Sequence, residues 1–401
     1  MSNDKNNPLI VIGGGIGGLA TALGLAESKK YVKVLEQAPE FLEIGAGIQL
    51  AANATNVLER FGVMDKLNDI AVFPKRLVLM DAFTGNELSA LDLGDAYKER
   101  YGSPYIVLHR SDLHKALYDK CQENAYIELI TDQSIVSTEE ADNAVTVTAA
   151  NGDVHTGEAA IGADGIWSKA RKLFVEDQPV CSEYVAYRGA IPMEDVTDVG
   201  SMDDVYMWIG PNFHLVQYPV RRGELYNQVV VFKSDSYSKE IEFTDQWGTP
   251  EEMDRVFEGT CKPVQTAIGF IQRQKRWPMY DREPIKNWTK GRVTLSGDAA
   301  HPMLQYLAQG ACQALEDASY LADMVGKHGD SIETAFQEYQ EERIPRTADV
   351  QKNARIWGEI IHAEKPETIL LRNTILAARG PQDYGFIDKF HGYGKSKVGA
   401  N

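Results

Sequence analysis

The chain has 401 residues, which is longer than one simple domain usually is and predicts two or three structural units. Apolar residues make up 43% and charged residues 25%, a balance typical of a globular protein with a sizeable core. The formal net charge of -17 argues against nucleic acid or an anionic membrane surface as a partner, because both repel an acidic protein. A small anionic ligand stays open, since a cleft can be locally basic.

Cysteine usage and the N-terminal segment bear on compartment and membrane. The four cysteines (Cys121, Cys181, Cys261 and Cys312) show no CxxC or metal-ligand spacing, so we expect reduced thiols in a cytoplasmic protein and no metal site. Residues 8–26 carry no charge, but six glycines interrupt them and no basic cluster precedes them. We therefore expect a strand, a glycine turn and a helix there, with neither a signal peptide nor a membrane span.

The predicted elements begin with a βαβ unit. Residues 9–12 form a short apolar strand, a helix runs from the glycine turn through Glu27, and residues 32–35 form a second strand that ends at Glu36. The next predicted elements are a hairpin over 76–93 with its turn at 84–86, a strand over 106–109, a helix over 111–122 capped by Ser111 or Asp112, and a buried strand over 159–163.

The pattern changes to antiparallel sheet between residues 181 and 277, where 214–220 and 225–232 flank a turn at 221–224. The α/β pattern returns with a strand over 293–296 and a helix over about 311–325. A C-terminal helix follows residue 330, because four apolar positions share one helical face, and the tail from Gly380 is expected to be irregular. Those four positions are Ile332, Ala335, Phe336 and Tyr339.

The glycine turn of the βαβ unit has the spacing GxGxxG. Gly13 allows a tight turn, Gly15 lets a pyrophosphate approach the backbone, and Gly18 lets helix and strand pack closely. Glu36, at the end of the second strand, is placed to hold ribose hydroxyls. A glycine-rich turn without a ligand is the alternative, but strand, helix and acid together favour dinucleotide binding. The motif alone does not separate FAD from NAD.

Two later motifs decide between these cofactors. The segment GADGIWSKAR at 162–171 and the segment GDAAHP at 297–302 each follow a buried strand. With the glycine motif, their order and spacing resemble those of the class A FAD-dependent aromatic hydroxylases, which share the p-hydroxybenzoate hydroxylase fold. The resemblance covers almost the whole chain. It implies non-covalent FAD, NADH or NADPH as co-substrate without a second glycine motif, and O2 as oxidant.

The resemblance also implies an α/β fold, α+β overall, in which a Rossmann-like FAD-binding domain carries an inserted antiparallel β-sheet domain for the substrate and C-terminal helices. The implied boundaries are 1–75, 100–180 and 281–330 for the FAD-binding domain, 76–99 and 181–280 for the substrate domain, and 331–401 for the C-terminal helices.

The implied FAD contacts follow the three motifs. By this resemblance, Glu36 holds the adenosine ribose of FAD, and Arg110 contacts its phosphate or ribose side. Asp164 and Gly165 serve FAD binding and the approach of the nicotinamide cofactor. Asp298 holds the ribityl region, and Gly310 and Ala311 lie by the isoalloxazine ring. The helix that starts near residue 311 would aim its positive end at the reduced flavin. Taken alone, Asp298 is a turn cap and Arg110 a surface ion pair.

Three segments concern the substrate: 210–219, 277–285 and 301–311 look most like the 3-hydroxybenzoate 6-hydroxylase group of this family. In that group a histidine and a glutamine are associated with the phenol, and they correspond to His214 and Gln305. A period-2 pattern puts His214, Val216 and Tyr218 on one strand face. His214, whose reference pKa lies near working pH, can accept the phenol proton, and the Gln305 amide can donate or accept. Structural roles are the alternative for both. Tyr218 and Tyr105 are weaker substrate-contact candidates, since such tyrosines are as often core.

The implied enzyme is a single-component monooxygenase that hydroxylates 3-hydroxybenzoate para to its hydroxyl, giving 2,5-dihydroxybenzoate. Three alternatives remain: the same chemistry on salicylate or a hydroxypyridine carboxylate, a non-oxygenating FAD oxidoreductase, and a non-catalytic FAD-binding redox module. The choice between NADH and NADPH, and between monomer and homodimer, stays open.

Overall fold

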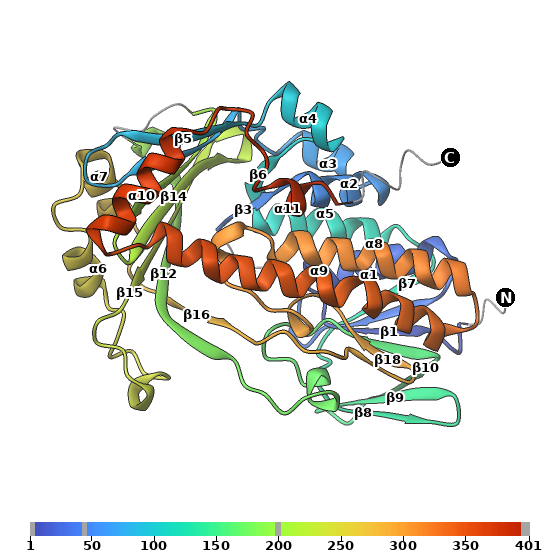
Figure 1. Ribbon diagram of the computed structural model, residues 1–401. Helices are drawn as coiled ribbons and strands as arrows, with labels where there is room; N and C mark the ends of the chain where they lie inside the picture. The colour runs from blue at the N-terminus through green and yellow to red at the C-terminus, as the bar shows by residue number, and fades with distance from the viewer. Residues whose placement is uncertain (1–4, 42–45, 197–201, 394–401) are drawn as a thin grey trace.

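The structure is a computed structural model that describes residues 5–41, 46–196 and 202–393, and a six-stranded sheet forms the centre of one half of it (Figure 1). Its neighbouring strands are all parallel except the last pair, β17 and β18. Across the sheet the strands are β17 (Thr289–Lys290), β18 (Val293–Leu295), β11 (Ala159–Gly162), β1 (Leu9–Ile12), β2 (Val32–Leu35) and β7 (Ile127–Ile130).

The two faces of this sheet are covered differently, and β1 shows why. Leu9 and Val11 pack against helices, whereas Ile10 and Ile12 pack against a three-stranded antiparallel sheet, as the alternation of a strand requires. The helices are α1 (Ile16–Glu27), α5 (Arg110–Gln122), α8 (Gly310–His328) and α9 (Ile332–Ile361), and the small sheet consists of β8 (Ile135–Ala141), β9 (Ala144–Ala149) and β10 (Val154–Gly157). The βαβ unit at the N-terminus is therefore confirmed.

A seven-stranded sheet forms the other half, on the left of Figure 1. Its order is β16 (Trp277–Asp281), β12 (Val180–Pro192), β15 (Leu225–Lys233), β14 (Phe213–Val220), β13 (Asp204–Gly210), β4 (Arg76–Asp81) and β5 (Glu87–Asp92). The sheet is not wholly antiparallel as expected, because β13 pairs with β4 in parallel. The hairpin β4–β5 comes from a remote part of the chain, so no tight turn dictates its direction.

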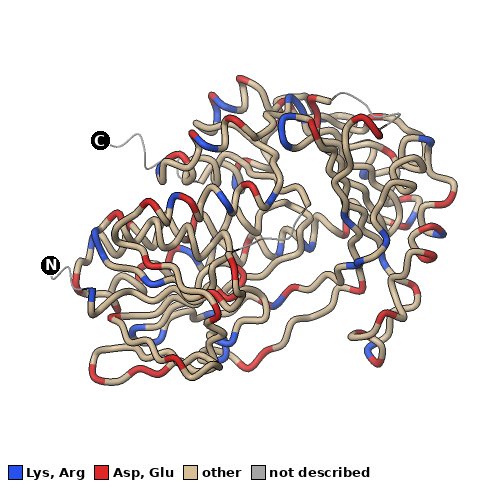
Figure 2. The backbone as a smooth tube through the Cα atoms, turned by 180° about the vertical axis from the view of Figure 1, so that it is seen from behind, with Lys and Arg blue, Asp and Glu red and all other residues tan. Residues whose placement is uncertain are grey.

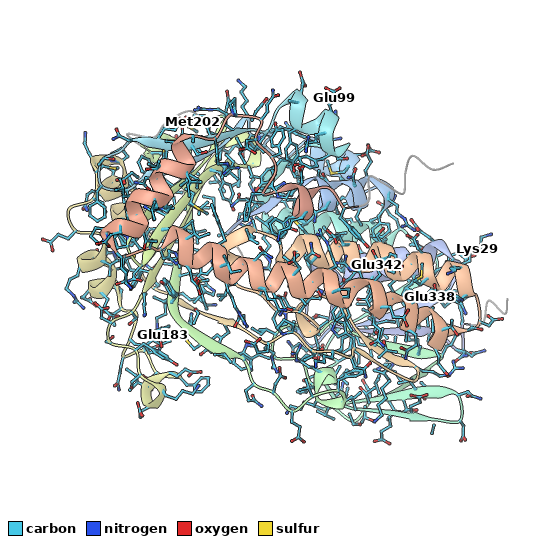
Figure 3. The ribbon with its side chains drawn as sticks, viewed as in Figure 1. Lys29, Glu99, Glu183, Met202, Glu338 and Glu342 are labelled. Carbon is cyan, nitrogen blue, oxygen red and sulfur yellow. The ribbon has the colours of Figure 1, made fainter. Side chains whose placement is uncertain are left out.

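The long strand β12 carries a bend. Its register with β16 shifts between Cys181 and Val185, and Glu183 has a φ of 67° there. Glu183 lies at the surface (Figure 3). It forms an ion pair with Lys233. The predicted α/β class is confirmed, whereas the domain boundaries stay a prediction.

One face of the seven-stranded sheet is buried and the other lines a cavity. Phe213 and Leu215 of β14 pack in the cluster beneath α6 (Pro250–Val256) and α7 (Lys262–Phe270). His214, Val216 and Tyr218 face the cavity, so the period-2 prediction is confirmed. The remaining elements are β3 (Gly47–Leu50), β6 (Ile106–His109), α2 (Ala52–Arg60), α3 (Met64–Asn68), α4 (Asp95–Tyr101), α10 (Pro366–Ala377) and α11 (Asp388–His391).

Two local predictions were wrong. Helix α5 begins at Arg110 after His109, and no side chain caps it, because the Ser111 hydroxyl is bonded to the His109 ring at 2.7 Å instead. The C-terminal tail is not wholly irregular, since it contains α11, although its last residues, 394–401, lie outside the described part of the chain.

Acidic and basic positions are interspersed along both halves of the backbone (Figure 2). Within the described ranges, no helix is long and apolar enough to cross a membrane.

Candidate active site

A cavity of about 410 Å³ lies between the seven-stranded sheet and the turns that follow strands of the six-stranded sheet. The glycine turn after β1, the segment after β11 and the turn after β18 form one side, and strands of the seven-stranded sheet form the other. Of the predicted site residues, the cavity wall includes Gly15, Tyr105, Arg110, Gly165, His214, Tyr218, Asp298, Gln305, Gly310 and Ala311. It does not include Gly13, Gly18, Glu36 or Asp164. The structure thus brings residues predicted to bind the cofactor and residues predicted to bind the substrate to the same cavity.

The three glycines of the turn serve different purposes. Gly13 has a φ of 110°, and a Cβ on Gly18 would lie 1.9 Å from the Gly13 carbonyl oxygen, so both are required by the fold of the turn itself. A Cβ on Gly15 would meet no atom within 4 Å. The protein therefore leaves open the place where a ligand can approach the backbone.

Glu36 and Asp164 make bonds within their own turns. One Glu36 oxygen accepts from the Gly14 N–H at 2.7 Å and the other from the Ala38 N–H at 2.9 Å. Asp164 accepts from the Ser168 hydroxyl at 2.5 Å and from the Lys169 N–H at 2.7 Å. Glu36 thus lies beside the glycine turn. The Asp164 carboxylate orders the segment that follows it, and Gly165 is the residue that faces the cavity.

His214 is paired with a histidine that lies 148 residues away in sequence. Its Nδ1 is 2.7 Å from Nε2 of His362, and the two rings stack with Tyr184 on the far side of His362. Burial lowers the pKa of His214 to about 3. His214 is therefore a neutral imidazole at neutral pH, with Nδ1 bonded to His362, and its contact with the phenol stays a prediction.

Gln305 opens a one-turn helix, Gln305–Leu307, and its amide is oriented by an arginine. Its Oε1 accepts from Nη2 of Arg188, on β12, at 2.7 Å. This bond occupies one of the two acceptor positions of the oxygen and turns the amide NH2 group away from Arg188, so the NH2 group is available as a donor. The contact of Gln305 with a phenol stays a prediction.

The two tyrosines are buried phenols. Tyr105 donates to Oε1 of Gln49 at 2.7 Å. Burial raises the pKa of both Tyr105 and Tyr218 above the ordinary value, so both stay protonated.

With this geometry described, comparison with known proteins identifies the family. The model of the FAD binding domain family matches residues 6–354. The chain belongs to this FAD-binding family. The 3-hydroxybenzoate 6-hydroxylase of Polaromonas naphthalenivorans is 40% identical over 386 residues, which cover 95% of this chain and 94% of that protein.

Other relatives extend the comparison. A 3-amino-4-hydroxybenzoate 2-monooxygenase of Streptomyces platensis is 33% identical over 396 residues, with 98% of this chain and 97% of that protein covered. Klebsiella pneumoniae HpxO complexed with FAD and uric acid superposes with a TM-score of 0.83 at 24% identity, covering 96% of each chain, and shows the shared fold. The predicted family is confirmed: the protein is an FAD-dependent monooxygenase that hydroxylates small aromatic compounds.

The open side of the cavity fits the FAD expected in this family. Gly15 and Gly165 leave their surroundings free, and Gly310 begins the long helix α8, whose N–H groups face the same space. The Asp298 side chain is exposed to the cavity, yet desolvation by the surrounding protein raises the pKa of its carboxyl. The Asp298 carboxyl is exposed toward the cavity, so a ligand that fills the cavity would remove further water from it.

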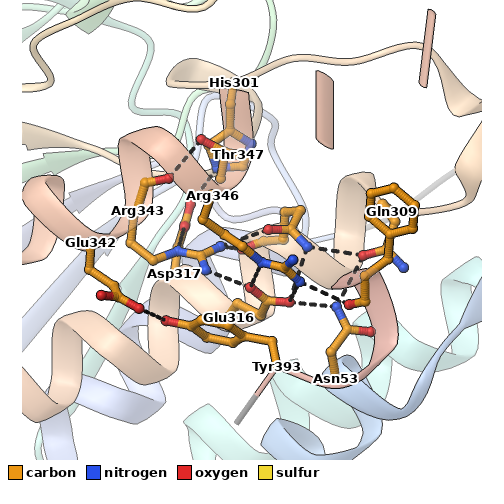
Figure 4. A network of polar contacts seen from close by, with 12 residues as sticks. Asn53, His301, Gln309, Glu316, Asp317, Glu342, Arg343, Arg346, Thr347 and Tyr393 are labelled. Atoms are coloured by element: carbon orange, nitrogen blue, oxygen red, sulfur yellow. Dashed lines mark hydrogen bonds and ion pairs between the residues drawn. The ribbon is translucent and has the colours of Figure 1, made fainter. Parts of the chain in front are cut away.

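A buried ionic network fixes the motif that contains Asp298 (Figure 4). Asp317 accepts from the Gly297 N–H at 2.9 Å and lies 2.6 Å from the His301 ring, while Arg343 of α9 donates to Asp317 at 2.7 Å. Arg343 also pairs with Glu316 of α8. This network joins α8 and α9 to the turn that faces the FAD site, and it gives His301 a structural partner.

Sequence reasoning missed several residues that line the cavity or bond to a lining residue. Arg188 had a visible signal, since it is the one charge in the apolar run 185–191. His362 had none, because only the fold brings it to His214. The tail also contributes wall residues that an irregular segment was not expected to supply, namely Phe386, Ile387, Phe390 and His391, together with Trp357 of α9.

Proposed function

We propose that this hydroxylase converts 3-hydroxybenzoate into 2,5-dihydroxybenzoate. NADH or NADPH supplies two electrons, O2 supplies one oxygen atom to the ring para to the hydroxyl, and the other oxygen atom leaves as water. The observation that carries the proposal is the meeting of His214 and Gln305 in the cavity that the glycine turn also lines. The relative named 3-hydroxybenzoate 6-hydroxylase, at 40% identity over almost the whole chain, supports the choice of substrate.

FAD, when bound, supplies the reducing equivalents and the activation of O2. The residues proposed to hold it are Glu36 at the adenosine ribose, Arg110 on the phosphate side, Gly13, Gly15 and Gly18 in the turn, Asp164 and Gly165 where the nicotinamide approaches, Asp298 at the ribityl chain, and Gly310 and Ala311 by the ring. Asp164 acts there by ordering its segment.

The phenol of the substrate is placed between two neutral groups. Nδ1 of His214 donates to His362 in the proposed tautomer, so Nε2 accepts the phenol hydrogen. The Gln305 amide nitrogen donates to the same phenol oxygen, because its carbonyl oxygen is held by Arg188. An ionised phenol is a far better carbon nucleophile than a neutral one, so these contacts promote attack by the para carbon.

The remaining wall orients the ring and excludes water. Leu77, Leu79 and Leu91 line the cavity from β4 and β5, and Phe386 and Phe390 line it from the tail. An apolar wall with few polar groups orients an aromatic ring and keeps water from the reacting atoms. Tyr218 and Tyr105 are proposed substrate contacts at the same cavity.

A substrate panel tests this proposal. NADH and NADPH oxidation and oxygen uptake are measured with 3-hydroxybenzoate, salicylate and 6-hydroxynicotinate, and products are identified by mass spectrometry. We expect 3-hydroxybenzoate to stimulate both rates most and to give 2,5-dihydroxybenzoate. Faster turnover of another acid would reject the substrate. Oxidation without oxygen incorporation would indicate an oxidoreductase, and flavin without ligand-stimulated turnover a redox module.

A further inference from the structure

Arg188 is a cation in the cavity wall that forms no ion pair with an acidic side chain in the described part of the chain. It lies on β12, its Nη2 donates to Oε1 of Gln305 at 2.7 Å, and its guanidinium lies 5.7 Å from the centre of the Trp277 ring. Among the described residues, its buried Nε has no hydrogen-bond partner and no carboxylate forms an ion pair with it. A half-buried guanidinium with an unsatisfied N–H needs a compensating charge or a ligand.

The charges around Arg188 do not neutralise it. Burial and the nearby Arg110 both lower the pKa of Arg188, and Tyr218 is the other titratable group that acts on it. An arginine remains charged despite such a shift. His214, on the neighbouring face of the cavity, is neutral, and Tyr218 stays protonated. Asp298 also lines the cavity, but the charges that act on its carboxyl are those of His301, Arg110 and Asp317, and it is not among the groups that act on Arg188. The Gln305 end of the cavity therefore has a positive potential that favours an anion.

The bond to Gln305 also decides how the amide is presented. An amide flipped by 180° would point its NH2 group at the guanidinium, which has no acceptor atom. The carbonyl oxygen therefore faces Arg188, and the NH2 group is available to the ligand. A donor that is polarised by an adjacent cation binds an anionic oxygen more strongly than a neutral hydroxyl.

We propose that Arg188 is a positioning residue that holds the Gln305 amide as a hydrogen-bond donor and thereby favours the ionised form of the phenol bound beside it. The proposal rests on the proposed function, in which Gln305 contacts the phenol. The phenol proton passes to water while Nε2 of His214 accepts a hydrogen bond from the phenol before it ionises, and Arg188 itself exchanges no proton. Sequence reasoning assigned Arg188 no role.

The test is a pH titration of bound substrate. FAD-loaded protein is titrated with 3-hydroxybenzoate, and the ultraviolet difference spectrum reports the phenol and phenolate fractions across pH. The variants are Arg188→Met, Arg188→Lys and Gln305→Glu. The matched control is Arg379→Met, because Arg379 also lines the cavity but donates to the Asp383 carbonyl rather than to Gln305.

We expect Arg188→Met to raise the pKa of the bound phenol by about one unit or more, which lowers the phenolate fraction about tenfold at a pH below that pKa. Arg188→Lys should recover part of the shift, since it keeps the charge, and Arg379→Met should leave the phenol unchanged. Gln305→Glu should also raise the pKa of the bound phenol. The variant places a carboxylate oxygen, instead of the NH2 donor, beside the phenol, and its other oxygen still accepts from Arg188.

Three results overturn the proposal. One is an unchanged phenol pKa in Arg188→Met. Another is weaker binding of 3-hydroxybenzoate, but not of unsubstituted phenol, in the same variant, which would show that Arg188 binds the carboxylate instead. If Arg188→Met does not retain FAD, Gln305→Glu carries the test, and an unchanged pKa there is the third. Absence of a wild-type complex with 3-hydroxybenzoate would reject the proposed substrate instead, and the titration is then run with salicylate.

Discussion

The sequence predicted His214 and Gln305 as site residues, and both line the cavity, but the hydrogen bonds and the pKa that set their chemical state could not be predicted. The strand alternation that turns His214 toward the cavity is local and readable. The pKa of His214 depends on burial and on His362, which lies 148 residues away, and the direction of the Gln305 amide depends on Arg188. Such long-range contacts leave no local pattern in a sequence.

The paired roles of His214 and Gln305 predict how their alanine variants behave. His214→Ala and Gln305→Ala should keep FAD, because neither residue belongs to the nucleotide motifs. The hydroxylation step should slow by about 10²–10⁴ for each, as expected when one positioned proton acceptor or donor is lost. The double variant should be less than additive if both act on one oxygen atom.

The readout is the ratio of hydroxylated product to hydrogen peroxide at saturating substrate. His155→Ala is the control, since His155 lies on β10 and bonds Gln133 away from the cavity. Wild-type coupling in both single variants at pH 7 would show that Gln305 is only a turn residue.

At the scale of elements, the glycine turn was predictable and the cavity wall formed by the tail was not. The turn is set by residues that are neighbours in sequence. The tail is held by distant partners: Tyr384 donates to the Asp92 carbonyl at 2.8 Å, and Arg100 pairs with Asp388 at 2.6 Å. The hydrophobic residues of the tail follow neither a helical nor a strand period, so the sequence predicted an irregular tail.

The open space around Gly15 gives a prediction for the turn between β1 and α1. Gly15→Ala should fold, because its Cβ meets no protein atom, but should bind FAD at least tenfold more weakly, because the Cβ occupies the ligand's approach. Gly269→Ala, whose Cβ also meets nothing within 4 Å but which lies on α7 outside the cavity, should bind FAD normally. The dissociation of FAD from each variant is followed by flavin fluorescence. Equal FAD affinities for Gly15→Ala and Gly269→Ala would contradict the placement of FAD beside Gly15.

At the scale of the whole molecule, the α/β class followed from the order of patterns along the chain. The strand order did not, because β11 and β18 join β1 and β2 from more than a hundred residues away in sequence. The candidate active site has the same property, since one side of the cavity is formed by turns of the six-stranded sheet and the other by strands of the seven-stranded sheet. The motifs predicted its residues, and only the fold brings those residues together.

Buried histidines make the stability of the molecule depend on pH. Burial lowers the pKa of His214 and His391 to about 3 and that of His362 to about 2. These values lie below the unfolded value of about 6.5, so the unfolded chain binds more protons between pH 3 and pH 6.5. Stability is complete above about pH 6.5 and is lost as the pH falls.

His391, which bonds the Tyr97 hydroxyl and neither of the other two histidines, should therefore lower the free energy of unfolding by about 2 kcal/mol between pH 7 and pH 5. Urea unfolding of the FAD-loaded protein at both pH values measures the loss, and His391→Gln should reduce it by about that amount. The same loss in wild type and variant would show that His391 is not buried as a neutral group.

We propose that the cavity directs one atom of O2 onto the ring of 3-hydroxybenzoate, para to its hydroxyl. A single reaction under oxygen-18 gas with NADH or NADPH, followed by mass spectrometry of the product, tests this proposal. We expect 2,5-dihydroxybenzoate that carries one labelled oxygen atom, with the original hydroxyl unlabelled. An unlabelled product, a different isomer, or cofactor oxidation that yields only hydrogen peroxide would contradict it.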